Sequence, residues 1–317
     1  MIDYPHNPLP RKQMHPALQF VTLFLMVATL MVFGSVIGGG IAMAKYGVGV
    51  ITDIQKLNTS GANVVSALWL IEFFGTTLPI LITPIFFSYV MVREPDVYIK
   101  HNFHFPWLLI VIVLLAMVAA MPLIEFLSNL NAKMVLPKSL KAIEDWMKQS
   151  ENEAEKLSNA MMQMNTLGDM IYSLLFIGLL TAIVEEILFR GCFQTIFLKW
   201  TKNMHAAIWI TAILFSAFHM EFYGFLPRML LGLLFGYFVA WSGSIWPAIL
   251  AHFVNNGTIV IWEYLYQNKM TSINPETPQF FTNAGYIISF FITILILFIY
   301  WYISSKWHVA HHGEELD

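Results

Sequence analysis

The sequence predicts an all-α fold, a polytopic membrane helical bundle of about eight transmembrane helices. Of its 317 residues, 57% are hydrophobic and only 12% are charged, whereas soluble domains carry roughly 25% charged residues. The mean hydropathy is +0.64, and apolar runs of membrane-spanning length recur along the chain. In lipid an isolated helix satisfies its own backbone polar groups, and the alternating pattern of a membrane β-barrel is absent from the sequence.

The predicted spans are the apolar runs that are long enough, or nearly so, to cross a hydrocarbon core of about 30 Å. The fifth run is the shortest of them. By residue number they are 18–42, 67–92, 106–127, 170–189, 206–219, 225–241, 245–264 and 285–304.

One long polar stretch, 128–168, separates the third span from the fourth. Its apolar residues recur at helical spacing and its charges gather on the other face, which predicts an amphipathic helix on the membrane surface or over the bundle. The helix fits either a substrate lid or a solvated connector. The apolar positions are Leu140, Ile143, Met147, Ala154, Leu157 and Met161.

Charge indicates the surroundings of the chain. The net charge of −3 offers no basic surface to nucleic acid, so the expected partners are the lipid bilayer and a membrane substrate. The predicted inner segments hold eight Lys and Arg residues against three in the short outer loops, although 128–168 adds five outside. This bias predicts a multi-pass protein, expected in a bacterial inner membrane, with its N-terminus and C-terminus in the cytoplasm.

Ionisable residues inside spans are candidates for a functional site because burying them in lipid is costly. The fourth span contains Glu185, Glu186 and Arg190. Residues four apart share a helix face, so Glu186 and Arg190 can form an ion pair. Glu185 is turned about 100° away, which leaves it without a partner in its own helix and available as a general base.

Two histidines and an amide lie in later spans. His219 ends the fifth, while His252 and Asn256 lie four residues apart in the seventh. Brought together with Glu185, these groups could bind and activate water, and an imidazole or amide could stabilise an oxyanion. Two further charges, Glu72 in the second span and Arg228 at the start of the sixth, fit pairing with a neighbour or an interfacial position, and Glu72 could also line a cavity.

These residues form three motifs, EExxxR at 185–190, FxxxH at 215–219 and HxxxN at 252–256. With this order, spacing and membrane context, the stretch 170–258 resembles the CPBP family of intramembrane proteases (CAAX proteases and bacteriocin-processing proteins, also called Abi), which includes the type II CAAX prenyl endopeptidases. The resemblance implies a helical core with a polar cavity for peptide hydrolysis. It further implies that Glu185 and His219 activate water, that His252 and Asn256 stabilise the oxyanion, and that Glu186 and Arg190 organise the site.

The resulting organisation has three parts. Residues 1–169 hold three transmembrane helices and the amphipathic extramembrane segment, 170–265 form the catalytic core, and 266–317 form the last transmembrane helix and a polar tail. The main hypothesis is an intramembrane endopeptidase acting on a peptide or protein substrate in the membrane, with lipidated substrates included. The alternatives are a non-enzymatic immunity or adaptor protein on the same fold, and a proton-coupled transporter, for which the internal repeats are missing.

The need for a cofactor stays open at this point. Glu185, His219 and His252 match the ligands of a catalytic zinc ion that keeps one position for water, so one divalent metal such as zinc is one version of the mechanism. The other is metal-free, with a glutamate-activated water. HExxH, the helical zinc signature of another protease class, is absent.

The predicted spans contain a conflict of depth. A fourth span ending at residue 189 puts Glu185 near one membrane surface, and a fifth span ending at His219 puts that histidine near the other. The two side chains can meet only if the fourth helix continues towards Trp200, or if 191–200 is a re-entrant segment.

Overall fold

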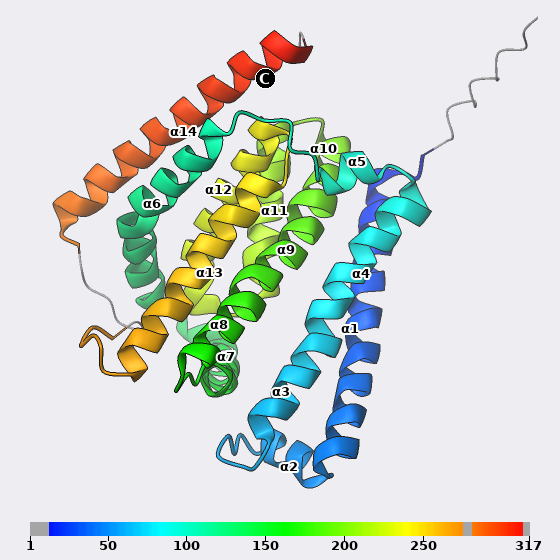
Figure 1. The fold of residues 1–317 in the computed structure, drawn as a ribbon, viewed down its shortest axis with the longest axis vertical. Helices are drawn as coiled ribbons and strands as arrows, with labels where there is room; N and C mark the ends of the chain where they lie inside the picture. The colour runs from blue at the N-terminus through cyan, green and yellow to red at the C-terminus, as the bar shows by residue number, and fades with distance from the viewer. Residues whose placement is uncertain (1–12, 275–280, 313–317) are drawn as a thin grey trace, which may run out of the picture.

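A computed structural model describes residues 13–274 and 281–312, with side chains described up to 307 and at 309. The all-α prediction is confirmed, since each predicted span lies in a helix (Figure 1). The polar tail from 313 to 317 lies outside the described residues. The crossing elements are α1 (Pro16–Tyr46), α3–η1–α4–η2 (Val64–Glu72, Phe73–Thr77, Leu78–Phe86, Phe87–Val92), α6 (Leu108–Ala132), α8–η4–α9–η5–α10 (Leu167–Ser173, Leu174–Leu180, Thr181–Glu186, Ile187–Phe193, Gln194–Thr201), α11 (Met204–Phe218), α12 (Phe225–Ser242), α13 (Trp246–Gln267) and α14 (Asn283–His312).

Within the described residues, six of these crossings are long and apolar enough to span a membrane by themselves. The other two are α11, which has only 15 residues, and α13, which is not among the six. Both pack against other crossings, α11 against α10 and α12, and α13 against α6, η4 and α12. The first turn of α1 and the last turns of α14 lie at the same end of the bundle (Figure 1), as an even number of crossings requires. Which end faces the cytoplasm stays a prediction.

The predicted end of the fourth span at residue 189 is wrong. The helix runs from Leu167 to Thr201, so the re-entrant alternative is also wrong. It begins at a capping box, in which Thr166 accepts from the backbone N–H of Asp169 and Asp169 accepts from that of Thr166. Its second half contains polar residues, and these are buried against neighbouring helices: Arg190, Gln194 and Thr195 are each at most 6% exposed.

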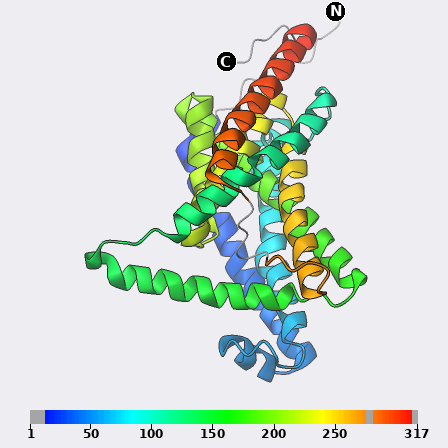
Figure 2. The same ribbon diagram turned by 90° about the vertical axis from the view of Figure 1, so that its left-hand side faces the viewer.

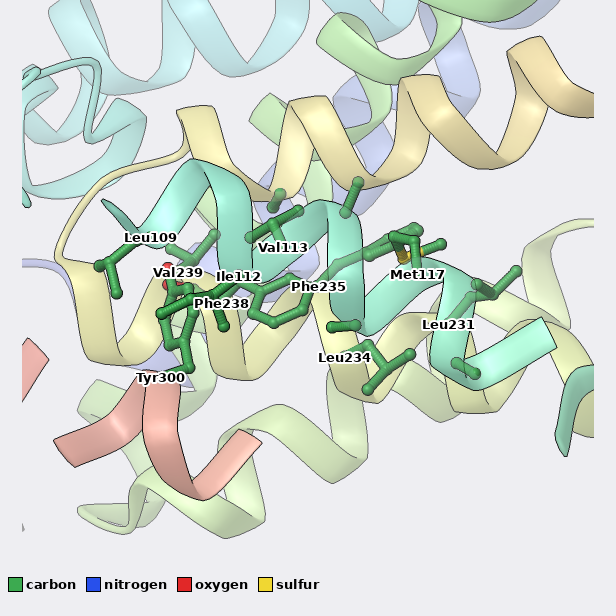
Figure 3. Close-up of a cluster of buried hydrophobic side chains, with 14 of the residues drawn as sticks. Leu109, Ile112, Val113, Met117, Leu231, Leu234, Phe235, Phe238, Val239 and Tyr300 are labelled. Atoms are coloured by element: carbon green, nitrogen blue, oxygen red, sulfur yellow. The ribbon is translucent and has the colours of Figure 1, made fainter. Parts of the chain in front are cut away.

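Two packing features hold the sixth crossing in place. One face of α12 joins α6 and α14 in an apolar cluster that includes Leu109, Phe238 and Tyr300 (Figure 3). On another face, a Cβ added to Gly232 would lie 3.0 Å from the Cα of Ala212 in α11. The spacing of Gly232 and Gly236 therefore serves close helix approach, as small residues four apart do in membranes.

The amphipathic helix predicted in 128–168 is confirmed as α7 (Lys141–Met161). It follows the short turn η3 (Lys138–Leu140). Figure 2 shows it lying across one end of the bundle, nearly at right angles to the crossing helices. The remaining short elements are α2 (Gly49–Gln55), α5 (Pro95–Ile99) and η6 (Phe222–Gly224). The division into three parts stays a prediction.

The close approach at Gly232 is testable. We expect Gly232→Leu to lower the free energy of unfolding by about 1–3 kcal/mol, because the added side chain must push α11 away from α12. Gly39→Leu is the matched control, since a Cβ at that helical glycine meets nothing within 4 Å. Thermal unfolding in detergent, followed by helix circular dichroism, measures both. Equal losses in the two variants would contradict the packing argument.

Candidate active site

The ion pair predicted inside the fourth crossing is present. Arg190 Nη1 lies 2.8 Å from Glu186 Oε1, and both side chains are 0% exposed. Arg190 Nη2 donates to the carbonyl oxygen of Gly232 at 3.3 Å. The guanidinium also lies 4.3 Å from the ring centroid of Phe215 and 5.2 Å from that of Phe235, which are cation–π distances. The charge of Arg190 is therefore balanced and enclosed by protein.

His252 is held by the same carboxylate. Its Nδ1 lies 2.9 Å from Glu186 Oε1, the oxygen that also contacts Arg190. Because a carboxylate only accepts, Nδ1 is assigned as the protonated nitrogen in this contact. The ring stacks on Phe235, with centroids 5.1 Å apart and an angle of 23° between the planes. This leaves Nε2 as the nitrogen free to face a ligand.

Glu185 has different surroundings from its neighbour. Its side chain is 16% exposed, whereas that of Glu186 is 0% exposed. Its Oε2 lies 3.8 Å from His252 Nε2, which is beyond hydrogen-bonding distance. Among the residues that the structure describes, this oxygen has no hydrogen-bond partner. As predicted, Glu185 is the carboxylate outside the ion pair, and it faces the free nitrogen of His252.

His219 reaches the same depth as Glu185 because α11 is short. Glu185 lies 16 residues before the end of α10 and His219 lies 15 residues after the start of α11, so both are about 22–24 Å from the turn that joins them. The rings of Phe189 and Phe215 meet in this hairpin, with centroids 5.1 Å apart. One helical turn farther from the hairpin turn, the same register puts Glu185 and His219 at matching positions of the two helices. The conflict of depth is thus removed.

The two histidines share an aromatic neighbour. The ring centroid of Phe215 lies 5.0 Å from that of His219 and 5.9 Å from that of His252. His219 Nδ1 lies 2.8 Å from the carbonyl oxygen of Phe215, one turn earlier, so Nδ1 is the donor there and Nε2 is left free. Both imidazoles therefore have one nitrogen fixed by protein and the other available.

Asn256 lies one turn after His252 on α13. Its Nδ2 donates to the carbonyl oxygen of Ile177 at 3.3 Å, and its Oδ1 accepts from Asn255 at 3.1 Å. Ile177 belongs to η4, a π-helical segment, and a second one, η5, follows α9, which carries both glutamates. Such segments are frequent at functional sites. Asn256 thus connects α13 to the helix of Glu185.

Two charges that the sequence left secondary lie near this group. Glu72 is exposed at the end of α3, inside the second crossing, and Thr76 Oγ1 lies 3.4 Å from its Oε2. Arg228 forms an ion pair with Glu221. Both Glu72 and Arg228 are within electrostatic reach of Glu185. The signal for Glu72 was a charge inside an apolar run, whereas nothing in the sequence distinguishes Arg228 from an interfacial arginine.

The predicted ligands of a zinc ion do not converge in the structure. Across residues 13–274 and 281–312, no group of three or more His, Cys, Asp and Glu side chains is placed to hold one metal ion. Glu185, His219 and His252 therefore do not form a zinc site as they are arranged.

Comparison with known sequences finds a protease family over the helices that carry the motifs. Residues 167–258 match the family model described as "Type II CAAX prenyl endopeptidase Rce1-like". The resemblance is confirmed. The matched segment begins at the first residue of α8 and ends within α13, so it contains every motif residue, although it covers less than a third of the chain.

A second similarity is shorter. Over 85 residues the chain is 29% identical to a Bacillus subtilis (strain 168) protein called "Uncharacterized protein YpbD". The alignment covers 26% of this chain and 40% of that protein, so it spans less than half of the relative. No solved structure matches the chain.

The buried ion pair of the matched segment gives a stability test. We expect Arg190→Met to lower the free energy of unfolding by about 3–5 kcal/mol, because it leaves Glu186 buried without its cation. Lys141→Met is the control: Lys141 pairs with Asp145 at 2.9 Å, but both side chains are more than half exposed. Removal of an exposed pair changes stability little. Denaturation in detergent by urea compares the two, and a similar shift in midpoint for both would count against the buried network.

Proposed function

We propose that this chain is an intramembrane endopeptidase that hydrolyses a peptide bond at or in the membrane with a glutamate-activated water. The observation that carries the proposal is the unequal state of two adjacent carboxylates. Glu186 is neutralised by Arg190, whereas Glu185 is outside that pair and lies 3.8 Å from the free nitrogen of His252. The Rce1-like match over the same helices supports the peptidase chemistry.

The proposed first step is attack by water. Glu185, with His219 Nε2 beside it, holds a water molecule and takes one of its protons while the oxygen attacks the carbonyl carbon of the substrate. The carbonyl becomes a tetrahedral oxyanion. The unpartnered oxygen of Glu185 supports this role because it accepts no hydrogen bond from the described part of the chain.

The proposed oxyanion site is made by α13. With Nδ1 donating to Glu186, a proton on His252 Nε2 would donate to the oxyanion, and the amide of Asn256 lies one turn away as the second donor. When the tetrahedral intermediate collapses, the C–N bond breaks and Glu185 gives its proton to the leaving nitrogen. Glu186 and Arg190 act as positioning residues, since Glu186 fixes the ring of His252.

The substrate class follows from the membrane position of the site. A peptide or protein segment that reaches the middle of the bundle must come from the bilayer or its surface, so the proposed partner is a membrane peptide. Lipidated substrates are included because the matched family is described by prenyl endopeptidase activity.

The decisive test is Glu185→Gln. We expect the purified full chain in proteoliposomes to cleave members of a membrane-peptide library, and the variant to lose about 10²–10⁴-fold in kcat with unchanged thermal unfolding. Glu144→Gln is the control, since that carboxylate is also buried but lies in α7. Cleavage by Glu185→Gln at the rate of the unchanged chain would overturn the proposed base. Full biological function of this variant without cleavage would instead favour the immunity or adaptor role.

Metal removal tests the glutamate-only version. We expect the same cleavage rate before and after excess chelator, and no metal in the purified protein, because the donor set does not converge on one point. Loss of activity on chelation with rescue by zinc would overturn this version while leaving the peptidase proposal intact.

A further inference from the structure

The side-chain amide of Asn256 has a nitrogen that donates hydrogen bonds and an oxygen that only accepts them. Only the nitrogen can stabilise an oxyanion. If the amide were rotated by 180°, its oxygen would take the place of its nitrogen and would repel the developing negative charge. The direction in which this amide is turned therefore decides whether Asn256 can act, and that direction is set by the hydrogen-bond partners of the amide.

Two glycines bring α13 close to η4 beside Asn256. A Cβ added to Gly178 would lie 3.2 Å from the ring of Phe253 and 3.8 Å from the Cα of Gly257. Small residues at such contacts let helix backbones approach closely in a membrane bundle. The chain neighbours of the two glycines are Ile177 and Asn256. The close approach thus brings a backbone carbonyl of η4 within reach of a side chain of α13.

The carbonyl oxygen of Ile177 fixes one end of the amide. It accepts from Asn256 Nδ2 at 3.3 Å. Because a carbonyl oxygen only accepts, the amide oxygen of Asn256 cannot take this place. Nδ2 carries two hydrogens, and the described part of the chain supplies an acceptor for one of them. The second N–H is left for a ligand.

Asn255 fixes the other end of the amide. Its Nδ2 donates to Asn256 Oδ1 at 3.1 Å, and both side chains are partly buried. In the reversed amide, the nitrogen of Asn256 would face the nitrogen of Asn255, and its oxygen would face the carbonyl oxygen of Ile177. Both hydrogen bonds would then be lost together. The two contacts act on opposite ends of one amide, so each supports the orientation that the other sets.

We propose that Asn255 is a positioning residue, which holds the amide of Asn256 with Nδ2 turned to η4 and Oδ1 turned away. This inference rests on the proposed peptidase function, in which Asn256 donates to the oxyanion. In this role Asn255 touches no reacting atom. It keeps the donor in place before substrate binds, and a donor that is already oriented needs no reorganisation when charge develops in the transition state.

Asn255→Leu tests the proposal on the full chain in proteoliposomes, with a library peptide that the unchanged chain cleaves. We expect kcat to fall about 10-fold, less than the roughly 10²–10³-fold for loss of an oxyanion donor. KM and thermal unfolding stay unchanged, because the oxyanion forms only in the transition state. Asn255→Asp keeps the size of the side chain but offers only acceptors to Asn256 Oδ1, so we expect a larger loss of kcat.

A double-mutant cycle separates positioning from an independent role. In the Asn256→Ala background no amide is left to orient, so we expect Asn255→Leu to cause no further loss of kcat there. Thr258→Val is the matched control on α13, since Thr258 Oγ1 donates only to the carbonyl of Val254 on its own helix, at 2.7 Å. Its effect should be the same in both backgrounds. An equal loss from Asn255→Leu in both backgrounds overturns the proposal.

The other outcomes are also decisive. A higher KM with unchanged kcat in Asn255→Leu means that Asn255 binds substrate, and unchanged kcat in both Asn255 variants means that it orients nothing; either result overturns the proposal. Asn255→Asp decides if Asn255→Leu lowers thermal stability. Glu185→Gln, assayed beside them, keeps the two questions apart. If it cleaves at the rate of the unchanged chain, the proposed function fails; if it is inactive and the cycle is additive, only the positioning role fails.

Discussion

The buried contact between Glu186 and Arg190 is the constraint on which the site depends. Both side chains are 0% exposed in the middle of a membrane bundle, and an isolated buried charge would cost several kcal/mol. The pair is held by His252, by the carbonyl of Gly232 and by two phenylalanine rings, while Glu186 Oε2 and Arg190 Nε have no hydrogen-bond partner among the described residues. These contacts come from α11, α12 and α13. One ion pair therefore fixes the rotation of the fourth crossing about its own axis, relative to α11, α12 and α13. In that rotation Glu185 is turned about 100° away from Glu186.

The same glycine of α12 allows close helix packing and binds Arg190. Without a side chain at Gly232, α11 approaches closely, and the carbonyl of the same residue accepts from Arg190. One turn later, the carbonyl of Gly236 accepts from Gln194 at 3.1 Å. Backbone carbonyls inside a helix already accept one bond and have a second lone pair for another donor, which a closely packed neighbour can reach. The two glycines thus let α12 satisfy polar groups of the fourth crossing while both remain in lipid.

The sequence could predict the features that depend on the geometry of a single helix. The pair of Glu186 and Arg190 followed from spacing of four, and α7 followed from its 3.6-residue period, because both depend on helix geometry alone. The length of the fourth crossing could not be predicted, since Arg190, Gln194 and Thr195 read as the end of a span when their partners are unknown. The link from Glu186 to His252 was missed for the same reason: it joins residues 66 positions apart on separate helices, and one sequence carries no signal for that distance.

Glu185 and Glu186 are adjacent, and their contacts decide which of the two can serve as the proposed base. Glu186 Oε1 already accepts from Arg190 and faces His252 Nδ1, so taking a proton there would weaken the contacts that hold the imidazole in place. Glu186 Oε2, like Glu185 Oε2, has no hydrogen-bond partner among the described residues, but a proton on either oxygen of Glu186 would remove the negative charge that balances the buried Arg190. Glu185 lies outside that pair and can gain a proton without this loss. A base must cycle between two protonation states in each turnover while its surroundings stay fixed. Of the two carboxylates, only Glu185 can do so with the ion pair intact.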